Sequence, residues 1–224
     1  MHRGPDAAGS FWNEHGSVGL GHRRLAIVDL EDTGNQPMRD CSGRFVIVFN
    51  GEIYNYLEIK KELLKLGHTF QSTSDTEVIL EGYKEWGDAI LNKLNGAFAF
   101  ALFDNNSNQV LIARDRAGEK PLFYSFENDI FYFSSEVKGL LKLKNNHPQI
   151  DTQSLDSFLT FGYIPGSSSM LKGVSKLEAG MALKFDISYH SFSLFRYWEL
   201  PALEQNPNDS LDDLTDELKA LLSE

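Results

Sequence analysis

Cysteine is almost absent from this sequence of 224 residues, because Cys41 is the only one. A single cysteine excludes an internal disulfide framework and predicts a reducing compartment, which we take to be the cytoplasm. No apolar run approaches the length that crosses a bilayer, and the first residues lack the charged-then-apolar order of a signal peptide. We therefore expect neither a disulfide scaffold nor a membrane protein.

Basic residues are also scarce. The 21 lysines and arginines are outnumbered by 32 acidic residues, and the net charge is −11. Binding a phosphate backbone needs a basic face, so nucleic acid is not an expected partner. The six histidines are scattered without the spacing of metal ligands, and no metal site is predicted.

Hydrophobic residues make up 42% of the chain, enough for a substantial core. Strand-like runs are separated by short turns, which favours antiparallel hairpins; these runs are 17–22, 44–49, 97–103, 109–114, 121–125 and 130–134, with a last hairpin between about 180 and 200. Helical periodicity predicts helices over 56–67, 74–87, 134–143 and 151–162, the last with Leu155, Phe158 and Leu159 facing inward. Strands grouped in hairpins with helices set apart indicate an α+β layered sandwich.

The composition changes near residue 201. Residues 201–209 are polar and contain proline, which is typical of a linker. Residues 210–224 then form an amphipathic pattern, with a stripe made by Leu211, Leu214, Leu218 and Leu221. We expect residues 1–200 to form one domain and this helix to be the first element of a further, absent domain.

The stretch VFNGEIYN, residues 48–55, places Asn50 and Gly51 where an apolar run meets a helical pattern. A side-chain amide and a glycine N–H beside a cleft are two converging hydrogen-bond donors, and such a pair can form an oxyanion hole. The alternative is a simple turn that closes the strand, because Asn-Gly is common in turns.

Two charged positions extend this hypothesis. Arg23 and Arg24 precede the apolar segment LAIVD, and an arginine there can bind a carboxylate through two hydrogen bonds; the alternative is a surface arginine. Asp75 begins a helical pattern and can accept from an amine; the alternative is that Ser74 or Asp75 is an N-cap. A zwitterionic amino acid with a reacting carbonyl would need such a set.

Seven segments in this order resemble one known family: HRGPD at 2–6, HRRLAIVD at 22–29, NGEIYN at 50–55, SDTE at 74–77, NGAFAFALFD at 95–104, RDRAGEKPLFY at 114–124 and SSEVKGLL at 134–141. They are similar to the glutamine amidotransferase domain of glutamine-hydrolysing asparagine synthetases. The resemblance continues through 158–180 and covers the chain to about residue 200.

The resemblance implies a class II amidotransferase with the N-terminal-nucleophile fold, a four-layer αββα sandwich of two antiparallel sheets. In that family an N-terminal cysteine attacks the side-chain amide of L-glutamine, with its own α-amine as general base. The residues implied to bind glutamine are Asn50 and Gly51 (oxyanion hole), Arg24 (α-carboxylate), Leu25, Ala26, Ile27 and Val28 (adjoining wall), Asp75 (α-amine) and Glu52 (pocket lining).

The implied partner of such a domain is a synthetase domain of the same chain, where ATP and Mg²⁺ activate aspartate to receive the ammonia. No cofactor is expected in the amidotransferase region itself, and a homodimer is an assembly that the resemblance allows.

One departure bears on activity. The family begins with Cys-Gly on a strand upstream of HRGPD, whereas Met1 precedes this motif here. We therefore expect the first strand and the nucleophile to be lacking, a sheet edge to be left unpaired, and glutaminase activity to be absent. Cys41 is internal, without a free α-amine, and is not expected to replace the nucleophile.

Two other interpretations stay open from the sequence. The same kind of domain occurs in enzymes that amidate sugars or other carboxylates, which only the downstream domain could distinguish. A chain without a nucleophile is also compatible with a non-catalytic module that binds an amino acid.

Overall fold

The computed structural model describes residues 3–143, 148–202 and 210–223. Its strands are β1 (Ala7–Trp12), β2 (Gly19–Arg24), β3 (Met38–Arg39), β4 (Phe45–Ile53), β5 (Gly96–Asp104), β6 (Gln109–Arg114), β7 (Phe123–Glu127), β8 (Ile130–Ser134), β9 (Ser175–Lys176), β10 (Met181–Asp186) and β11 (Ser191–Arg196). Its α-helices are α1 (Tyr56–Lys65), α2 (Asp75–Trp86), α3 (Ile90–Lys93), α4 (Val137–Leu143), α5 (Thr152–Phe161) and α6 (Leu211–Ser223), with short 3₁₀ helices at Asp32–Gly34 and Gly87–Ala89.

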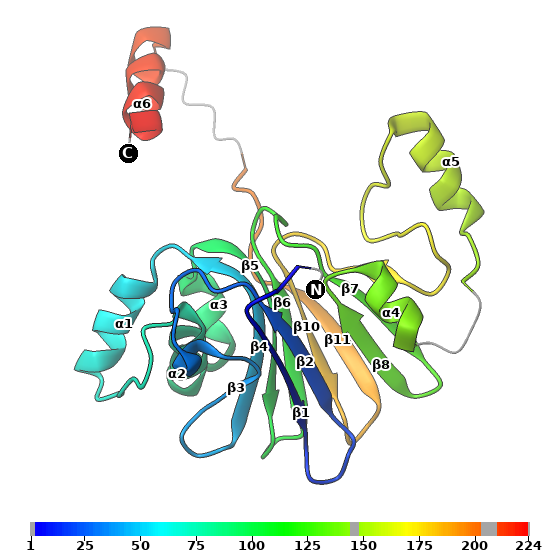
Figure 1. The fold of residues 1–224 in the computed structure, drawn as a ribbon. Helices are drawn as coiled ribbons and strands as arrows, with labels where there is room; N and C mark the ends of the chain where they lie inside the picture. Colours follow the sequence, from blue (N-terminus) through cyan, green and yellow to red (C-terminus); the bar gives the residue numbers. More distant parts are fainter. Residues whose placement is uncertain (1–2, 144–147, 203–209, 224) are drawn as a thin grey trace.

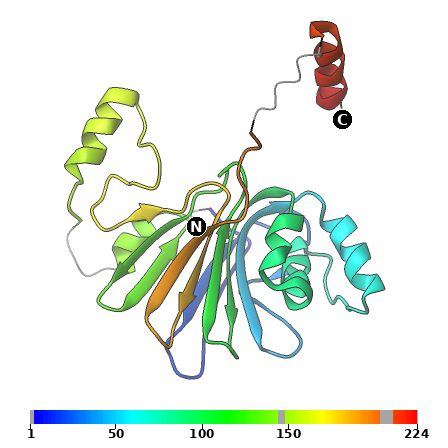
Figure 2. The same cartoon turned by 180° about the vertical axis from the view of Figure 1, so that it is seen from behind.

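A six-stranded sheet in the order β11-β10-β6-β5-β4-β3 forms the centre (Figure 1). Helices α1, α2 and α3 cover one face, seen from behind in Figure 2, and bury a core of aliphatic and aromatic residues against it. A second core lies on the other face, against the hairpin β1–β2 and the small sheet β8-β7-β9. Helix α4 packs on β7 and β8.

The α+β class with antiparallel pairing is therefore confirmed, because every strand pair found is antiparallel. One detail of the expectation is wrong: the strands form three sheets, not two. In the described residues β2 pairs only with β1, and β7 pairs only with β8 and β9, so the second layer is in two pieces. A cavity lies between these pieces, as described below.

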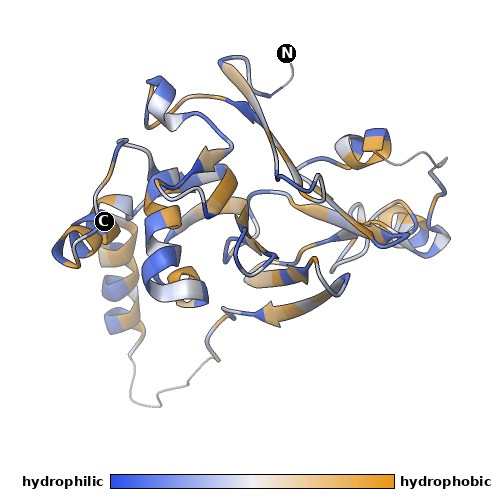
Figure 3. Cartoon of the chain, turned by 90° about the horizontal axis from the view of Figure 1, so that it is seen from below, coloured by the Kyte–Doolittle hydropathy of each residue, from blue (hydrophilic) through white to orange (hydrophobic). Residues whose placement is uncertain are grey.

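Strand β5 shows why the centre is buried on both sides. Its bulky residues Phe98, Phe100 and Leu102 face the helices, while Ala99 and Ala101 face the second layer, and all five are buried. Figure 3 shows how hydrophobic residues gather along the strands and on one side of the helices. The alternation of alanine with large side chains along 97–103 thus gives β5 one small and one bulky face, both of them covered.

The peripheral helices differ from expectation in their packing. Helix α5 forms as predicted, but Phe158 is 44% and Leu159 is 74% exposed, so the inward placement of these two residues is wrong; Leu155 is half-buried. Helix α5 stands away from the sheets (Figure 1). Among the described residues, no other element covers its apolar side. Three strands and one helix were not predicted, because they are short or carry mixed polar and small residues; these are β1, β3, β9 and α3.

Helix α6 also forms where its leucine stripe predicts it. Leu211, Leu214, Leu218 and Leu221 are all exposed. The linker proposed for 201–209 lies mostly outside the described residues, and the assignment of α6 to a further domain stays a prediction. None of the described helices combines the length and the apolar character needed to cross a membrane.

The loop between β6 and β7 is organised around one fully buried carboxylate, Asp115. Its Oδ2 accepts from the backbone N–H groups of Phe98 (3.2 Å) and Lys120 (3.0 Å), and its Oδ1 accepts from Glu119 N–H (2.9 Å). A buried donor that loses its acceptor costs about 1–3 kcal/mol. Asp115 thus ties the loop to Phe98, near the start of β5.

We expect Asp115→Ala to lower the free energy of unfolding by about 3 kcal/mol or more, since three backbone donors would lose their acceptor. Asp115→Asn keeps one acceptor oxygen and should cost less. Urea unfolding measures both, with the exposed Asp156→Ala as control, expected to change stability by less than about 0.5 kcal/mol. A loss for Asp115→Ala no greater than for the control would contradict this account.

Candidate functional site

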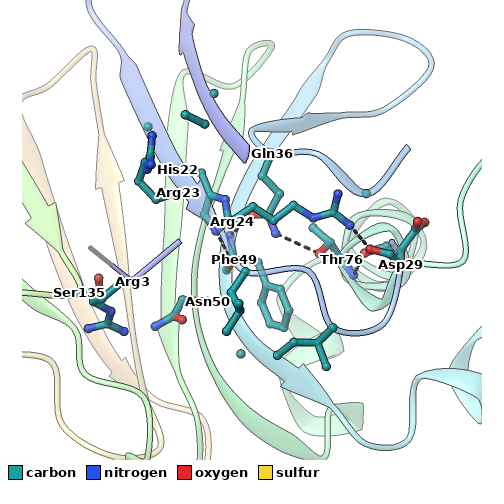
Figure 4. A pocket seen from close by; sticks show the side chains of 18 of the residues that line it. Arg3, His22, Arg23, Arg24, Asp29, Gln36, Phe49, Asn50, Thr76 and Ser135 are labelled. Atoms are coloured by element: carbon teal, nitrogen blue, oxygen red, sulfur yellow. Dashed lines mark hydrogen bonds between the residues drawn. The ribbon is translucent and has the colours of Figure 1, made fainter. Parts of the chain in front are cut away.

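A cavity of about 920 Å³ lies between the hairpin β1–β2, the C-terminal part of β4, the start of α2 and the segments before β7 and α4 (Figure 4). Small-molecule sites typically occupy about 300–1,000 Å³. The lining residues with polar side chains are Arg3, Ser10, His22, Arg23, Arg24, Asp29, Gln36, Asn50, Ser74, Asp75, Thr76, Lys120, Ser135 and Glu136.

The floor of the cavity is an unpaired edge of β4. Strand β3 pairs with β4 only at Ile47 and Val46, while β4 continues to Ile53. Beyond β3, the N–H groups of Phe49, Gly51 and Ile53 share one side of the strand, because these groups alternate along a strand. Phe49 N–H donates to Gln36 Oε1 at 2.6 Å and Ile53 N–H donates to Asp75 Oδ2 at 3.0 Å.

Gly51 N–H lies between these two bonds and faces the cavity. Its opposite residue on β5, Phe98, does not bond to it, because Phe98 N–H donates to Asp115 and Phe98 C=O accepts from Asp115 N–H. Gly51 and Phe98 are therefore a non-hydrogen-bonded pair. Of the three N–H groups on this edge, the one at Gly51 is left for a ligand.

One expectation about Gly51 is corrected, and the structure shows why glycine is needed there. The turn alternative for Asn50-Gly51 is wrong, since β4 runs straight through both residues. The need for glycine arises from β5, because a Cβ at Gly51 would clash with the Ala97 carbonyl oxygen and lie 2.7 Å from Phe98 Cα. The backbone φ of 155° also favours glycine.

Asn50 supplies a second donor. Its side chain points to the same face as Val46 and Val48, between the two β layers, because side chains alternate along a strand. Its amide nitrogen Nδ2 is buried and has no hydrogen-bond partner among the described residues. An orphaned buried donor is uncommon in proteins, and together with Gly51 N–H it can stabilise a developing negative charge on an oxygen.

Asp75 is the first residue of α2 and is buried. The N-cap is Ser74, whose Oγ accepts from Thr76 N–H at 3.2 Å, so the capping alternative for Asp75 is wrong. Burial, the largest effect, raises the pKa of the Asp75 carboxyl, and the charge of Glu52 adds to it, against the hydrogen bond from Ile53 N–H. A cation that enters the cavity would relieve this cost of burying the charge.

Arg24 is buried, in contrast to the exposed Arg23, and the surface alternative for Arg24 is wrong. Its Nη1 donates to Glu31 C=O (2.8 Å) and Asn35 Oδ1 (2.9 Å), and its Nη2 donates to Asp29 C=O. Arg24 therefore holds the segment 29–35 in place, a role that the sequence did not reveal. Its Nε–H and the second hydrogen on Nη2 have no partner among the described residues and remain for an anion.

Asp29 completes the same segment and was also missed. Its carboxylate accepts from Glu31 N–H (2.9 Å), Thr33 Oγ1 (3.2 Å) and Thr73 N–H (3.1 Å), the last of which joins the segment to the loop before α2. Burial alone would raise the pKa of Asp29, but these hydrogen bonds to the charged form outweigh burial and lower it.

The cavity brings together most of the residues predicted from the sequence. Lining residues among them are Arg24, Leu25, Ile27, Val28, Asn50, Gly51 and Asp75. Ala26 and Glu52 do not line it; Ala26 N–H donates to Asp6 Oδ2 at 2.9 Å. Cys41 is exposed, accepts from Gln71 Nε2 at 3.1 Å and lies outside the lining.

His22 is half-buried, and its Nε2 donates to Phe49 C=O at 3.0 Å. Burial lowers the pKa of its imidazole, which favours the neutral ring. It also lines the cavity, as do Arg3 and Gln36, which were assigned no role from the sequence. The sequence offered two signals for them: Arg3 lies within the HRGPD segment, and Gln36 precedes Pro37, which stands directly before strand β3.

Comparison with known proteins decides the family. The family described as glutamine amidotransferase domain matches residues 1–198. This chain belongs to that family. The glutamine amidotransferase fold is also seen in a solved structure, the glutamine phosphoribosylpyrophosphate amidotransferase from Bacillus subtilis, with a TM-score of 0.54 and 23% identity, covering 80% of this chain and 35% of that one.

Curated relatives of this amidotransferase domain carry asparagine synthetase names. A putative glutamine-hydrolyzing asparagine synthetase 2 of Methanocaldococcus jannaschii is 40% identical over 218 residues, 89% of this chain and 42% of the relative. Glutamine-hydrolyzing asparagine synthetase 1 of Bacillus subtilis is 43% identical over 180 residues, 80% of this chain and 28% of the relative. The chain thus spans less than half the length of these relatives.

The two buried carboxyls of the amidotransferase site should respond to neutralisation in opposite directions. The folded pKa of Asp75 is raised, so its charge opposes folding above that pKa, and Asp75→Asn should melt at or above the wild-type temperature at pH 7. The difference should shrink as the pH falls through the raised pKa, because the wild-type carboxyl then becomes neutral.

Asp29→Asn is the matched control for this prediction. Its folded pKa is lowered, so the carboxylate stabilises the fold above the unfolded pKa, and that contribution is lost as pH falls through the folded pKa. Asp29→Asn should therefore lower the melting temperature at pH 7. Thermal melts of both variants at several pH values check the pair, and equal shifts in one direction would contradict the assignment.

Proposed function

We propose that this chain is the glutamine-binding part of an asparagine synthetase-like enzyme. The α-carboxylate of L-glutamine binds the free N–H groups of Arg24, and its α-amine binds Asp75. The side-chain carbonyl oxygen then faces Gly51 N–H and Asn50 Nδ2, which stabilise the oxyanion formed when the amide is attacked. Ammonia leaves for a synthetase domain, where ATP and Mg²⁺ activate aspartate.

One observation carries the proposal. The edge of β4 has two of its three N–H groups bonded to Gln36 and Asp75, and the third, at Gly51, faces the cavity beside the unpartnered Asn50 amide. A purely structural strand edge would leave no such pair of donors beside an arginine and a buried carboxylate. The names of the curated relatives support glutamine as the ligand.

The proposal assigns recognition and oxyanion stabilisation to the described residues, and not the nucleophile. Cys41 lies outside the cavity lining, so it is not placed to attack an amide bound there. The cytoplasmic location stays a prediction that rests on this single free cysteine.

The acceptor of the ammonia has a second candidate. A relative named amidase chry2 from Gibberella zeae is 34% identical over 225 residues, 100% of this chain and 33% of the relative. Its name differs from that of an asparagine synthetase, and the alternative that a sugar or another carboxylate is the acceptor stays open. The described residues bind the donor and are common to both candidates.

Calorimetric titration with L-glutamine tests the proposal on the 224-residue chain. Arg24→Ala should weaken binding about 30- to 150-fold, the effect of losing a charge-assisted partner worth about 2–3 kcal/mol. Asp75→Asn should weaken it about tenfold or more. The control is Arg196→Ala, because Arg196 is exposed and lies outside the cavity lining; it should change affinity less than about twofold.

Because Arg24 also holds segment 29–35, its alanine variant is first checked by a thermal melt, and Arg24→Lys, which keeps the charge without the planar fork, is titrated beside it. An unchanged glutamine affinity in folded Arg24→Ala would mean that Arg24 is only an organiser of the segment. Absence of glutamine binding to the wild-type chain would overturn the proposed function.

The same preparation should bind glutamine without releasing glutamate, because the only cysteine among its 224 residues is outside the cavity. A coupled glutamate assay over several hours checks this, with Cys41→Ser as control. Turnover that disappears in Cys41→Ser would make Cys41 the nucleophile and contradict the placement given above.

A further inference from the structure

The pairing between β3 and β4 is completed by a side chain, not by the backbone. Hydrogen-bonded pairs recur every second residue in an antiparallel ladder. Phe45 C=O accepts from Asp40 N–H at 3.1 Å, and Ile47 lies opposite Met38, so the next pair would be Phe49 with Gln36. Phe49 N–H instead donates to the side-chain oxygen of Gln36, at 2.6 Å.

The backbone of Gln36 is turned to another element. A Cβ on Gly9 of β1 would clash with the Gln36 carbonyl oxygen, so β1 approaches the chain closely at this point and only glycine fits. The side-chain oxygen of Gln36 therefore accepts from Phe49 N–H in place of the Gln36 main-chain carbonyl.

The other end of the Gln36 amide reaches α2. Its Nε2 donates to Thr76 Oγ1 at 3.3 Å, drawn as a dashed line in Figure 4. Phe49 immediately precedes Asn50, and Thr76 immediately follows Asp75. A single planar amide thus bonds to the neighbours of both ends of the site: the oxyanion donors on β4 and the carboxylate on α2.

We propose that Gln36 is a positioning residue that fixes the distance between the oxyanion donors and the amine acceptor. The inference rests on the proposed function, because this distance matters only for a ligand that spans both ends, as glutamine does. Gln36 need not touch glutamine to act in this way. Geometric errors of about 1 Å at a site can lower activity strongly, so a rigid link between β4 and α2 has a functional effect.

Two ligands distinguish a positioning role of Gln36 from a general effect on the stability of the fold. L-Glutamine spans the site from Asp75 to Gly51, whereas L-norvaline has the α-amine and α-carboxylate but no side-chain amide, and so uses one end only. We expect Gln36→Met, which keeps a side chain of similar length without the amide, to reduce the ratio of glutamine affinity to norvaline affinity about tenfold, the value of one net hydrogen bond. Norvaline affinity itself should change less than about twofold.

Gln71→Met is the matched control, since Gln71 is exposed and its amide contacts Cys41 outside the cavity. Its affinity ratio should equal that of the wild type. Dissociation constants for both ligands come from NMR shift titrations, which also report through the amide signal of Gly51 whether glutamine still reaches the oxyanion donors. An unchanged ratio in Gln36→Met would overturn the positioning role.

A second pair of variants keeps the test decisive if Gln36→Met does not fold. Thr76→Val removes the hydroxyl that accepts from Gln36, and Thr76→Ser restores it. The affinity ratio should fall in Thr76→Val and recover in Thr76→Ser; equal ratios in the two would overturn the inference. Failure of the wild-type chain to bind glutamine would instead reject the proposed function, so the two failures are distinguishable.

Discussion

An antiparallel strand that continues past its neighbour exposes every second N–H and C=O group along its edge, and each such buried group needs a partner. Strand β4 is in this position from Phe49 to Ile53, because β3 is two residues long. Side chains from other elements supply the partners at both ends: Gln36 and His22 at Phe49, and Asp75 at Ile53. The group in the middle stays open, and the site is built around it.

This constraint also explains how distant segments meet. The partners of the β4 edge come from the hairpin β1–β2, the segment before β3 and the start of α2, so satisfying the strand draws these three elements around one cavity. Carboxylates complete the arrangement. Asp29 accepts from the backbone N–H groups of Glu31 and Thr73 and so joins segment 29–35 to the loop before α2. Asp115 binds Phe98 near the start of β5, the neighbour of β4.

The electrostatics of the site follow from burial. Arg24 and Asp75 are both buried, and each forms hydrogen bonds to the protein backbone: Arg24 donates to Glu31 C=O, and Asp75 accepts from Ile53 N–H. Enough hydrogen-bonding capacity is left on each to bind one charged end of an amino acid. The pKa of Asp75 is raised because its carboxylate is buried without a cation beside it. The pKa of Asp29 is lowered because hydrogen-bond donors stabilise its charged form. Two buried carboxyls thus have different tasks, set by their partners.

Much of the fold could be read from the sequence because it depends on local patterns. Period-two runs indicated the long strands, and helical periodicity indicated α1, α2, α4, α5 and α6. Ordered motifs indicated the family, which the match over residues 1–198 supports. Motif matching also pointed to Arg24, Asn50, Gly51 and Asp75, and the cavity contains all four. Three inferences about tertiary surroundings failed: the inward face of α5, a second layer made of one sheet, and the turn alternative for Asn50-Gly51.

Only the tertiary structure decided which polar groups remain free. The sequence determined that an amide, a glycine, an arginine and a carboxylate occur in suitable segments, since these properties belong to single residues and their neighbours. It could not determine that Gln36 replaces a backbone partner of Phe49, or that the Gly51 N–H is the one left over. Such facts depend on where β3 stops beside β4 and how closely β1 and β5 approach, because a hydrogen bond is available to a ligand only if no other part of the chain has taken it.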